Sequence, residues 1–234
     1  MTRQKIDLYD DGIGSVELVD HMGSDLTIVN SARVSFGKQK GSLDEKDEKL
    51  IRYLVNHRHT STFEHNVVTF RFVVPLFVRS QHHRHRTWSY NEISRRYTDI
   101  DIMFYEPKVF RTQHQSNRQS SNQNDLINPL IEPHSISGGN KADYLVRVHH
   151  KEALKLYHKL LKSGVCREQA RGVLPQNMYT QYYGTVNLNN LMNFINLRTH
   201  AGAQWEIQKV AHACLDLASL IWPIAVESFR RSND

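Results

Sequence analysis

The chain has 234 residues, a length that a single domain with a substantial core can account for. Its formal net charge of +6 favours anionic partners, such as nucleotides, nucleic acid or an acidic membrane surface. No apolar run is long enough to cross a bilayer and no apolar segment follows residues 1–5, so we expect neither a membrane protein nor a signal peptide.

The first part of the chain shows a strand pattern followed by helix patterns. Residues 16–20 alternate between apolar and polar side chains, which predicts a strand, and residues 25–36 are predicted to be helical. Ser42 and Glu45 have the spacing of a capping box, so we predict that Ser42 is the N-cap of a helix.

A second strand is predicted over residues 66–74, which are rich in β-branched and aromatic side chains. Pro75 ends this strand and is expected to start a helix that leads into a cluster of arginines. Residues 110–141 are rich in Gln, Asn and Ser, so we expect a surface excursion that is partly disordered.

The remaining elements are mostly helical. We predict helices over 142–163 and 165–174, a strand over 179–186, and helices over 190–198 and 204–229. Gly164 and Pro175 are expected to end the first two of these helices. Because strands and helices mix without a regular alternation, we predict an α+β fold. It would be a single domain over residues 1–234, with a mixed or antiparallel sheet flanked by helices and a polar insertion at about 111–141.

The most informative segment is residues 84–97, which contain four arginines. Planar guanidinium groups bind phosphates and other planar anions through paired hydrogen bonds. Ser89, Asn91 and Ser94 add neutral donors and acceptors of the kind that fix the orientation of a ligand. The segment therefore predicts one wall of a site for an anionic ligand.

The same segment also fits a surface that binds nucleic acid. Trp88, Tyr90 and Tyr97 are interleaved with the arginines, as in proteins that stack on bases. Composition alone does not separate a phosphate clamp from a basic surface of this kind.

Residues 59–65 and the histidines His82, His83 and His85 contain groups that could bind a metal. Their spacing matches neither the H-E-x-x-H pattern nor a cysteine–histidine knuckle, so we predict no metal site. A hydrogen-bonding loop before the strand is the simpler interpretation.

Two further segments carry polar groups without an obvious structural role. Arg171 lies near a helix end stopped by proline, where it could bind terminal carbonyls or reach a phosphate. Five asparagines occur within residues 187–196, and some of them are expected to cap a helix. Asn193 and Asn196 instead suggest hydrogen bonds to a heterocycle, although a solvated helix face is the alternative. No GxGxxG or GxxxxGK[ST] loop is present, so any dinucleotide would be held in another way.

Together these residues resemble the flavin-dependent thymidylate synthases, which make thymidylate from deoxyuridylate (dUMP) using FAD. The family signature RHRxxSxNxxSxR is matched at every fixed position: Arg84, His85, Arg86, Ser89, Asn91, Ser94 and Arg96. Similar blocks occur in the same order at residues 32–36, 59–65, 171–175, 185–187 and 193–198. The resemblance covers about residues 6–110 and 142–229.

The resemblance implies a set of site residues. The residues expected to contact dUMP are Gln81, Arg84, Glu92, Ser94, Arg95, Arg96, Arg171 and Arg198. The residues expected at FAD are Ser35, Ser61, Glu64, Arg84, His85, Arg86, Glu92, Asn187, Asn189 and Asn193. Asn189 departs from the basic residue that some members carry, and Ser61 replaces a frequent threonine while keeping the hydroxyl. The resemblance also implies a homotetramer with shared active sites.

The expected reaction is reductive methylation of dUMP to dTMP, with methylenetetrahydrofolate as carbon donor and NADPH as reductant. Arg198 is the expected catalytic residue, because its charge would stabilise negative charge that develops on uracil. Ser94 is expected to bind phosphate, since no base that would activate it is evident. Cys166 and Cys214 lie in helix-like sequence and are expected to be buried structural thiols, in line with a cytoplasmic setting. The competing interpretations are a basic nucleic-acid-binding protein without catalysis and a catalytically inactive relative.

Overall fold

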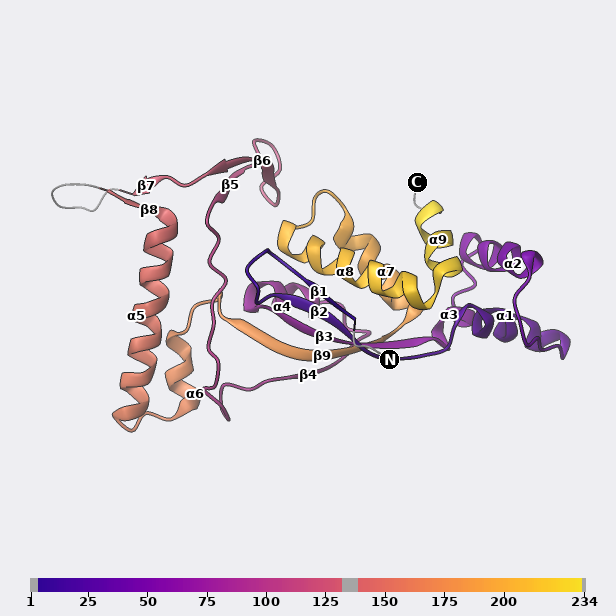
Figure 1. Cartoon of the computed structure of the whole chain (residues 1–234), viewed down its shortest axis with the longest axis horizontal. Coiled ribbons are helices and arrows are strands. Elements are labelled where there is room, and N and C mark those ends of the chain that lie inside the picture. The colour runs from indigo at the N-terminus through magenta and orange to yellow at the C-terminus, as the bar shows by residue number, and fades with distance from the viewer. Residues whose placement is uncertain (1–3, 132–138, 233–234) are drawn as a thin grey trace. The chain divides into compact units, whose positions relative to one another are not determined.

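The computed structural model describes residues 4–131 and 139–232 (Figure 1). These residues divide into two compact units. Unit 1 comprises Met1–Val73, His82–Asn91 and Tyr182–Asp234, and unit 2 comprises Val74–Gln81 and Glu92–Gln181. The single domain over the whole chain stays a prediction.

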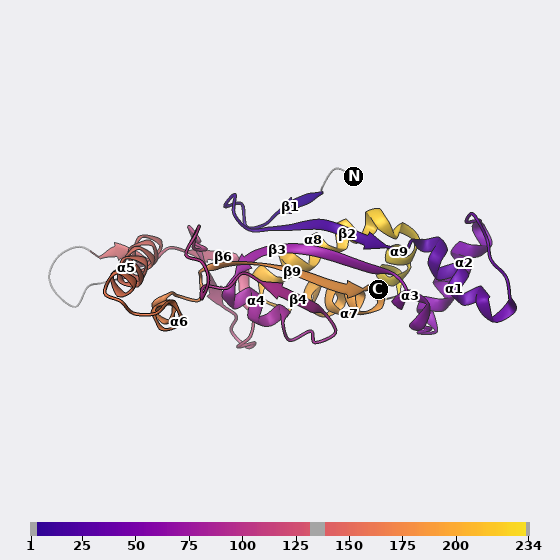
Figure 2. The ribbon, with the colours of Figure 1, turned by 90° about the horizontal axis from the view of Figure 1, so that it is seen from below.

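The main sheet has five strands in the order β1-β2-β3-β9-β4. Their bounds are β1 (Lys5–Asp7), β2 (Ser15–Met22), β3 (Val67–Pro75), β4 (Ser89–Glu92) and β9 (Tyr179–Asn187). Strands β1, β2 and β3 pair antiparallel, and the register of β2 against β3 shifts between Leu18 and Asp20. Figure 2 shows these strands side by side. The strands predicted over 16–20, 66–74 and 179–186 are therefore confirmed.

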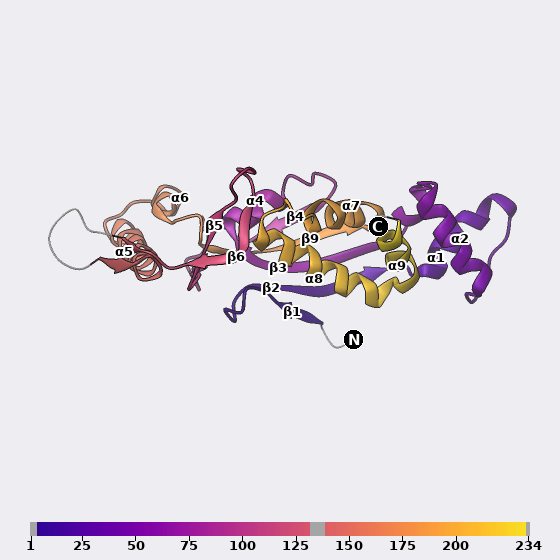
Figure 3. The ribbon, with the colours of Figure 1, turned by 90° about the horizontal axis from the view of Figure 1, so that it is seen from above.

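Helices of unit 1 cover one face of this sheet, as Figures 1 and 3 show for α7 and α8. The helical segments of unit 1 are α1 (Asp25–Arg33), η1 (Val34–Phe36), α2 (Glu45–Asn56), α3 (Ser61–Glu64), α7 (Leu188–Thr199), α8 (Trp205–Ile221) and α9 (Pro223–Arg231). Alternate residues of β3, including Val68, Phe70 and Phe72, are fully buried, as are Leu191 and Phe194 of α7. Burying such side chains stabilises the fold by roughly 1.5–3 kcal/mol each. The predicted α+β class, with an antiparallel sheet flanked by helices, is confirmed.

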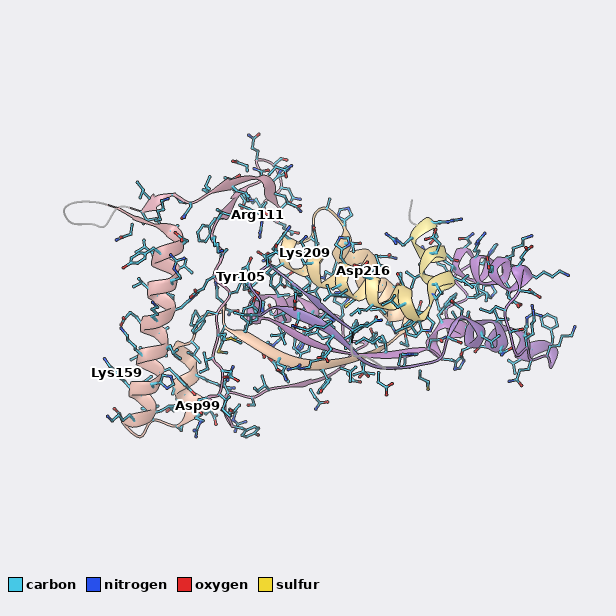
Figure 4. The ribbon with its side chains drawn as sticks, viewed as in Figure 1. Asp99, Tyr105, Arg111, Lys159, Lys209 and Asp216 are labelled. Carbon is cyan, nitrogen blue, oxygen red and sulfur yellow. The ribbon has the colours of Figure 1, made fainter. Side chains whose placement is uncertain are left out.

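Unit 2 is built around a long helix. Its elements are α4 (Leu76–His82, whose last residue belongs to unit 1), β5 (Phe110–Gln113), β6 (Ser121–Ile127), β7 (Leu130–Ile131), β8 (Asn140–Lys141), α5 (Ala142–Lys162), α6 (Arg167–Ala170) and η2 (Arg171–Val173). Tyr105, labelled in Figure 4, is buried and packs on Phe77 with ring centroids 5.9 Å apart. The helix over 142–163 is confirmed, and Gly164 follows it with a left-handed φ of 87°.

The polar segment 110–141 forms two short antiparallel pairs, β5 with β6 and β7 with β8. Most of its described side chains are exposed, which agrees with a surface excursion. Part of the expected disorder falls on residues 132–138, which lie outside the described residues.

Three predictions about helix caps and helix boundaries are wrong. Asp44, not Ser42, is the N-cap of α2, because its carboxylate accepts from the backbone N–H groups of Lys46 and Asp47. The helix predicted over 165–174 breaks into α6 and the 3-10 turn η2. The helix predicted over 204–229 is interrupted at Trp222, and α9 starts at Pro223, whose missing N–H suits the first helical position.

A buried carboxylate fixes the start of α9. Asp25 Oδ2 accepts from the N–H of Ile224 at 3.1 Å, and Oδ1 accepts from that of Ala225 at 3.0 Å. Burial raises the pKa of Asp25, and these backbone hydrogen bonds oppose that rise. Asp25 thus ties the first residue of α1 to the last helix of the chain.

The two cysteines differ from each other. Cys214 is buried in α8 as expected, but Cys166 is exposed and lies just before α6, so its predicted burial is wrong. Among the helices of the described residues, none is both long enough and apolar enough to cross a membrane.

Candidate active site

The signature segment is anchored in the core of unit 1 by His82 and Trp88. His82 is fully buried, with Nδ1 2.8 Å from the hydroxyl oxygen of Tyr182. Burial lowers the pKa of His82 well below its usual value, and the nearby His85 adds to this effect. His82 is therefore neutral, and its role is to hold the segment.

Trp88 packs against Phe72 and Phe194, with ring centroids 6.0 and 5.5 Å apart, and is only 6% exposed. A glycine at position 184 allows this packing, because a Cβ there would lie 2.9 Å from the Phe72 ring and 3.2 Å from that of Trp88. The suggestion that Trp88 stacks on nucleic-acid bases is thus wrong. The Tyr90 hydroxyl donates to the carbonyl of His82 at 3.0 Å and is likewise turned inward.

Arg198 on α7 contacts the histidine of the signature. Its Nε donates to Nε2 of His85 at a distance of 3.0 Å. Burial and the positive charge of Arg198 lower the pKa of His85 to about 4. The imidazole is therefore neutral at pH 7, with Nε2 unprotonated and able to accept. Burial also lowers the pKa of Arg198, which nevertheless stays charged. Arg84 and Arg86, on either side of His85, are exposed.

A cavity of about 560 Å³ lies in unit 1. Its lining residues are Leu54, Val55, Asn56, Arg58, Thr60, Phe63, Asn189, Asn193, Asn196, Phe229 and Ser232. Asn189, Asn193 and Asn196 follow each other at spacings of four and three, so they share one face of α7. A wall of amides beside apolar rings fits a planar heterocycle with polar edges.

Some of the predicted flavin contacts line this cavity and others do not. Asn189 and Asn193 line it, and Asn189 Nδ2 donates to Glu64 Oε1 at 3.3 Å. Asn187 instead caps α7, because its Oδ1 accepts from the backbone N–H of Asn190 at 2.9 Å. Ser35 lies on η1, where its hydroxyl donates to the carbonyl of Ala32, and it is not among the lining residues.

The lining residues Asn56, Arg58 and Thr60 were not among the predicted site residues. Asn56 is the last residue of α2 and the other two follow it, where the local sequence carries no ligand-binding pattern. The cavity does include Asn196, which the pattern of asparagines had singled out.

In unit 2, Glu92 is held by two donors. Arg79 Nε donates to Glu92 Oε1 at 3.0 Å and the Thr180 hydroxyl donates to the same oxygen at 2.6 Å. This arrangement fixes the carboxylate of Glu92 at the end of β4. Gln81, also predicted at the substrate, is half-buried on α4.

The two adjacent arginines within residues 84–97 lie in different environments. Arg95 is only 7% exposed, and its guanidinium donates to the carbonyl of Ile100 at 2.6 Å, so it holds its own loop. Arg96 is exposed and forms an ion pair with Glu168 at 3.3 Å. The backbone N–H of Arg96 donates to the Ser94 hydroxyl oxygen at 3.2 Å. Arg171, at the start of η2, is exposed.

The predicted site residues are thus divided between the units. Unit 1 contains Ser35, Ser61, Glu64, Arg84, His85, Arg86, Asn187, Asn189, Asn193 and Arg198, and unit 2 contains Gln81, Glu92, Ser94, Arg95, Arg96 and Arg171. In the described part of the chain, no group of three or more His, Cys, Asp or Glu side chains could hold a metal ion.

A family profile and individual known proteins both match most of this chain. The profile of a family described as "Thymidylate synthase complementing protein" matches residues 17–224. The chain is 43% identical over 216 residues to a flavin-dependent thymidylate synthase of Thermus thermophilus, covering 92% of this chain and 75% of that one. A flavin-dependent thymidylate synthase of Thermotoga neapolitana is 42% identical over 225 residues, covering 96% of this chain and 94% of that one.

A solved structure supports the same relationship. A UMP/dUMP methylase, PolB from Streptomyces cacaoi, bound with 5-Br dUMP, superposes with a TM-score of 0.79 at 34% identity. The superposition covers 97% of each chain. The resemblance found in the signature residues is confirmed: the chain belongs to the family of flavin-dependent thymidylate synthases.

Proposed function

We propose that this chain catalyses the FAD-dependent reductive methylation of dUMP to dTMP. The carbon donor would be methylenetetrahydrofolate and the reductant NADPH. Family membership and the likeness to a UMP/dUMP methylase support a methyltransferase that acts on dUMP. The structural observation on which the proposal depends is the contact between Arg198 and the neutral His85 of the signature.

The residues of the cavity in unit 1 fit a flavin coenzyme. Asn193 and Asn196 offer amide donors and acceptors to a heterocycle edge, and Phe63 and Phe229 offer apolar rings. When bound, FAD supplies the reducing electrons, so the folate need donate only its one-carbon unit. Glu64, Ser61 and the asparagines would hold and orient the coenzyme.

A flavin also removes the need for a cysteine nucleophile. Cys214 is buried, and burial raises the pKa of its thiol, so it does not supply a reactive thiolate. Cys166 is exposed, and we assign it no role. Cys166→Ser is therefore expected to leave turnover unchanged, and loss of turnover would point to a cysteine-dependent reaction.

Arg198 is the proposed catalytic residue. Its guanidinium, held in place by His85, would stabilise the negative charge that develops at N3 and O4 of uracil and so make C5 nucleophilic. Preorganised donors of this kind contribute about 3 kcal/mol to transition-state stabilisation. Arg96 and Arg171, both exposed in unit 2, would bind phosphate or carbonyl groups of the substrate.

Ser94 is proposed to bind the phosphate of dUMP. Its hydroxyl oxygen accepts from the backbone N–H of Arg96, which leaves the O–H free to donate to an anion. Ser94→Ala is expected to weaken dUMP binding while measurable turnover remains. Complete loss of turnover with normal binding would instead assign Ser94 a chemical role.

The decisive experiment is spectroscopic. The purified protein, or protein reconstituted with FAD, should absorb at roughly 450 nm as flavoproteins do. It should also release tritium from dUMP labelled at C5 when supplied with methylenetetrahydrofolate and NADPH. Arg198→Ala should keep the flavin absorbance and lose most of this release. A protein that neither contains nor takes up flavin would overturn the proposal.

We also propose a homotetramer in the cytoplasm. Large apolar side chains of unit 1, among them Val34 at 73% and Phe36 at 78% exposure, could be buried between subunits. Light scattering on the purified protein tests the assembly, and a monomer at micromolar concentration would contradict it.

A further inference from the structure

Helix α2 ends in a turn that normally requires glycine. The N–H of His59 donates to the carbonyl of Leu54 at 2.9 Å, and the N–H of Arg58 donates to that of Val55 at 3.0 Å. These two bonds form a Schellman motif, whose next-to-last residue adopts a left-handed conformation. Arg58 is that residue, with φ of 54°, although a side chain with a Cβ is disfavoured there. Local backbone structure therefore does not explain the arginine.

The side chain of Arg58 lines the cavity of unit 1 and is the one charged group among its described lining residues. The others are asparagines, a threonine, a serine and apolar side chains, with no carboxylate. Within the part of the chain that the structure describes, the guanidinium of Arg58 makes neither an ion pair nor a side-chain hydrogen bond. The nearest following carboxylate in the chain, Glu64 on α3, accepts from Asn189 instead.

A cavity with amides, apolar rings and one uncompensated cation matches a particular kind of ligand. The amides and rings suit a heterocycle, and the cation suits an oxyanion on the same molecule. We propose that Arg58 is an anion-binding residue of this cavity, which binds the phosphate or carboxylate group of a heterocyclic ligand that contacts Asn193 and Asn196. This inference rests on the proposed function, in which the ligand would be FAD with its diphosphate or, as the second source of an oxyanion, the folate with its glutamate carboxylates.

The test compares Arg58→Gly with Arg58→Lys and a matched control. Glycine is the residue that the turn prefers, so Arg58→Gly should fold with an unchanged or higher Tm. The control is Arg52→Gln, which removes an exposed arginine of the preceding helix α2 that pairs with Glu48 and does not line the cavity.

The dissociation constant of FAD is measured by fluorescence titration of the apoprotein, and that of riboflavin, which has no phosphate, in parallel. Loss of a charge-assisted hydrogen bond should weaken FAD binding by Arg58→Gly roughly tenfold or more. The affinity of Arg58→Gly for riboflavin should not change. Arg58→Lys should lose less affinity for FAD than Arg58→Gly, and Arg52→Gln should bind FAD as tightly as the wild type. That pattern assigns the diphosphate of FAD as the bound group.

The second arm measures the KM for methylenetetrahydrofolate carrying one or three glutamates. A rise in KM for the triglutamate alone, with FAD binding intact, assigns the carboxylates as the bound group. If Arg58→Gly changes neither FAD affinity nor this KM, the inference is wrong. A wild-type protein that binds no flavin would instead overturn the proposed function. In that case Arg58 is tested with inorganic pyrophosphate, which should raise the Tm of the wild type and not that of Arg58→Gly.

Discussion

Nε of Arg198 donates a hydrogen bond to Nε2 of His85 across 3.0 Å, although the two residues are 113 positions apart in the chain. The contact requires a neutral imidazole, because a protonated Nε2 would be a donor facing a donor. Burial and the charge of Arg198 supply that condition by lowering the pKa of His85 to about 4. The signature histidine thus orients the arginine that is proposed to act on uracil.

Two substitutions of His85 should distinguish its role as hydrogen-bond acceptor for Arg198 from any contribution of the imidazole ring itself. In His85→Leu, Nε of Arg198 loses the acceptor on His85, and we expect kcat to fall by roughly 10–100-fold, since hydrogen bonds to charged groups are worth about 1.5–3 kcal/mol. In His85→Gln the amide oxygen can accept from Arg198, so most of kcat should return. Because His85 is also a proposed FAD contact, FAD affinity is measured for each variant and kcat is taken at saturating FAD. Equal kcat values for the Leu and Gln variants would contradict the orienting role.

Acid should destabilise the protein through the same histidine. The pKa of His85 is about 4 in the folded protein and about 6.5 in the unfolded chain, so the unfolded chain binds more protons below pH 6.5. The contribution to stability is therefore complete above pH 6.5 and is lost as the pH falls toward and through 4. The buried His82 acts in the same direction.

The measurement is Tm as a function of pH for the wild type and His85→Gln, whose side chain does not titrate. The variant should show a smaller fall in Tm between pH 6.5 and 4.5, with a residual slope from His82 and the carboxylates. Parallel curves for the two proteins would show that His85 does not carry the effect.

Two glycines with positive φ allow conformational strain to be separated from steric overlap. A Cβ at Gly23, where φ is 88°, would lie 2.2 Å from Oδ1 of Asn66, whereas at Gly12, where φ is 72°, it meets no atom within 4 Å. Gly12→Ala should therefore lose only about 1 kcal/mol of unfolding free energy. Gly23→Ala should lose more than about 3 kcal/mol, because it also displaces Asn66, which accepts from Trp222 Nε1 at 3.0 Å. Urea unfolding of both variants measures the difference, and equal losses would contradict it.

A buried carboxylate should stabilise the segment between α1 and α2. Asp47 has no exposed surface, forms ion pairs with Arg33 and Lys40, and accepts from the backbone N–H of Asp44 at 3.0 Å. Asp47→Asn leaves both cations without their buried partner and should lower the free energy of unfolding by about 3 kcal/mol. The matched control is Glu45→Gln in the first turn of the same helix, which is exposed and should change it by less than about 0.5 kcal/mol. A loss for Asp47→Asn no larger than that of the control would contradict this role.

Elements whose signals are local could be predicted from the amino-acid sequence. Alternation of side chains identified β2, a run of β-branched and aromatic residues identified β3, and Gly164 marked the end of α5, because each pattern depends on residues only a few positions apart. The signature residues identified the family, since seven fixed positions within one short segment rarely match together. Ser42 failed as a cap because Asp44 offers the same chemistry two residues later, next to the first turn.

The roles of the polar side chains, in contrast, depend on how the chain folds in three dimensions. Arg95 and Arg96 are adjacent and alike in sequence, yet one is buried on its own loop and the other is exposed. Trp88 lies in the core, and Arg58 lines a cavity whose other wall comes from α7. Burial, pKa and hydrogen-bond partners depend on residues that can lie more than a hundred positions apart in the chain, as His85 and Arg198 do. No local pattern contains that information.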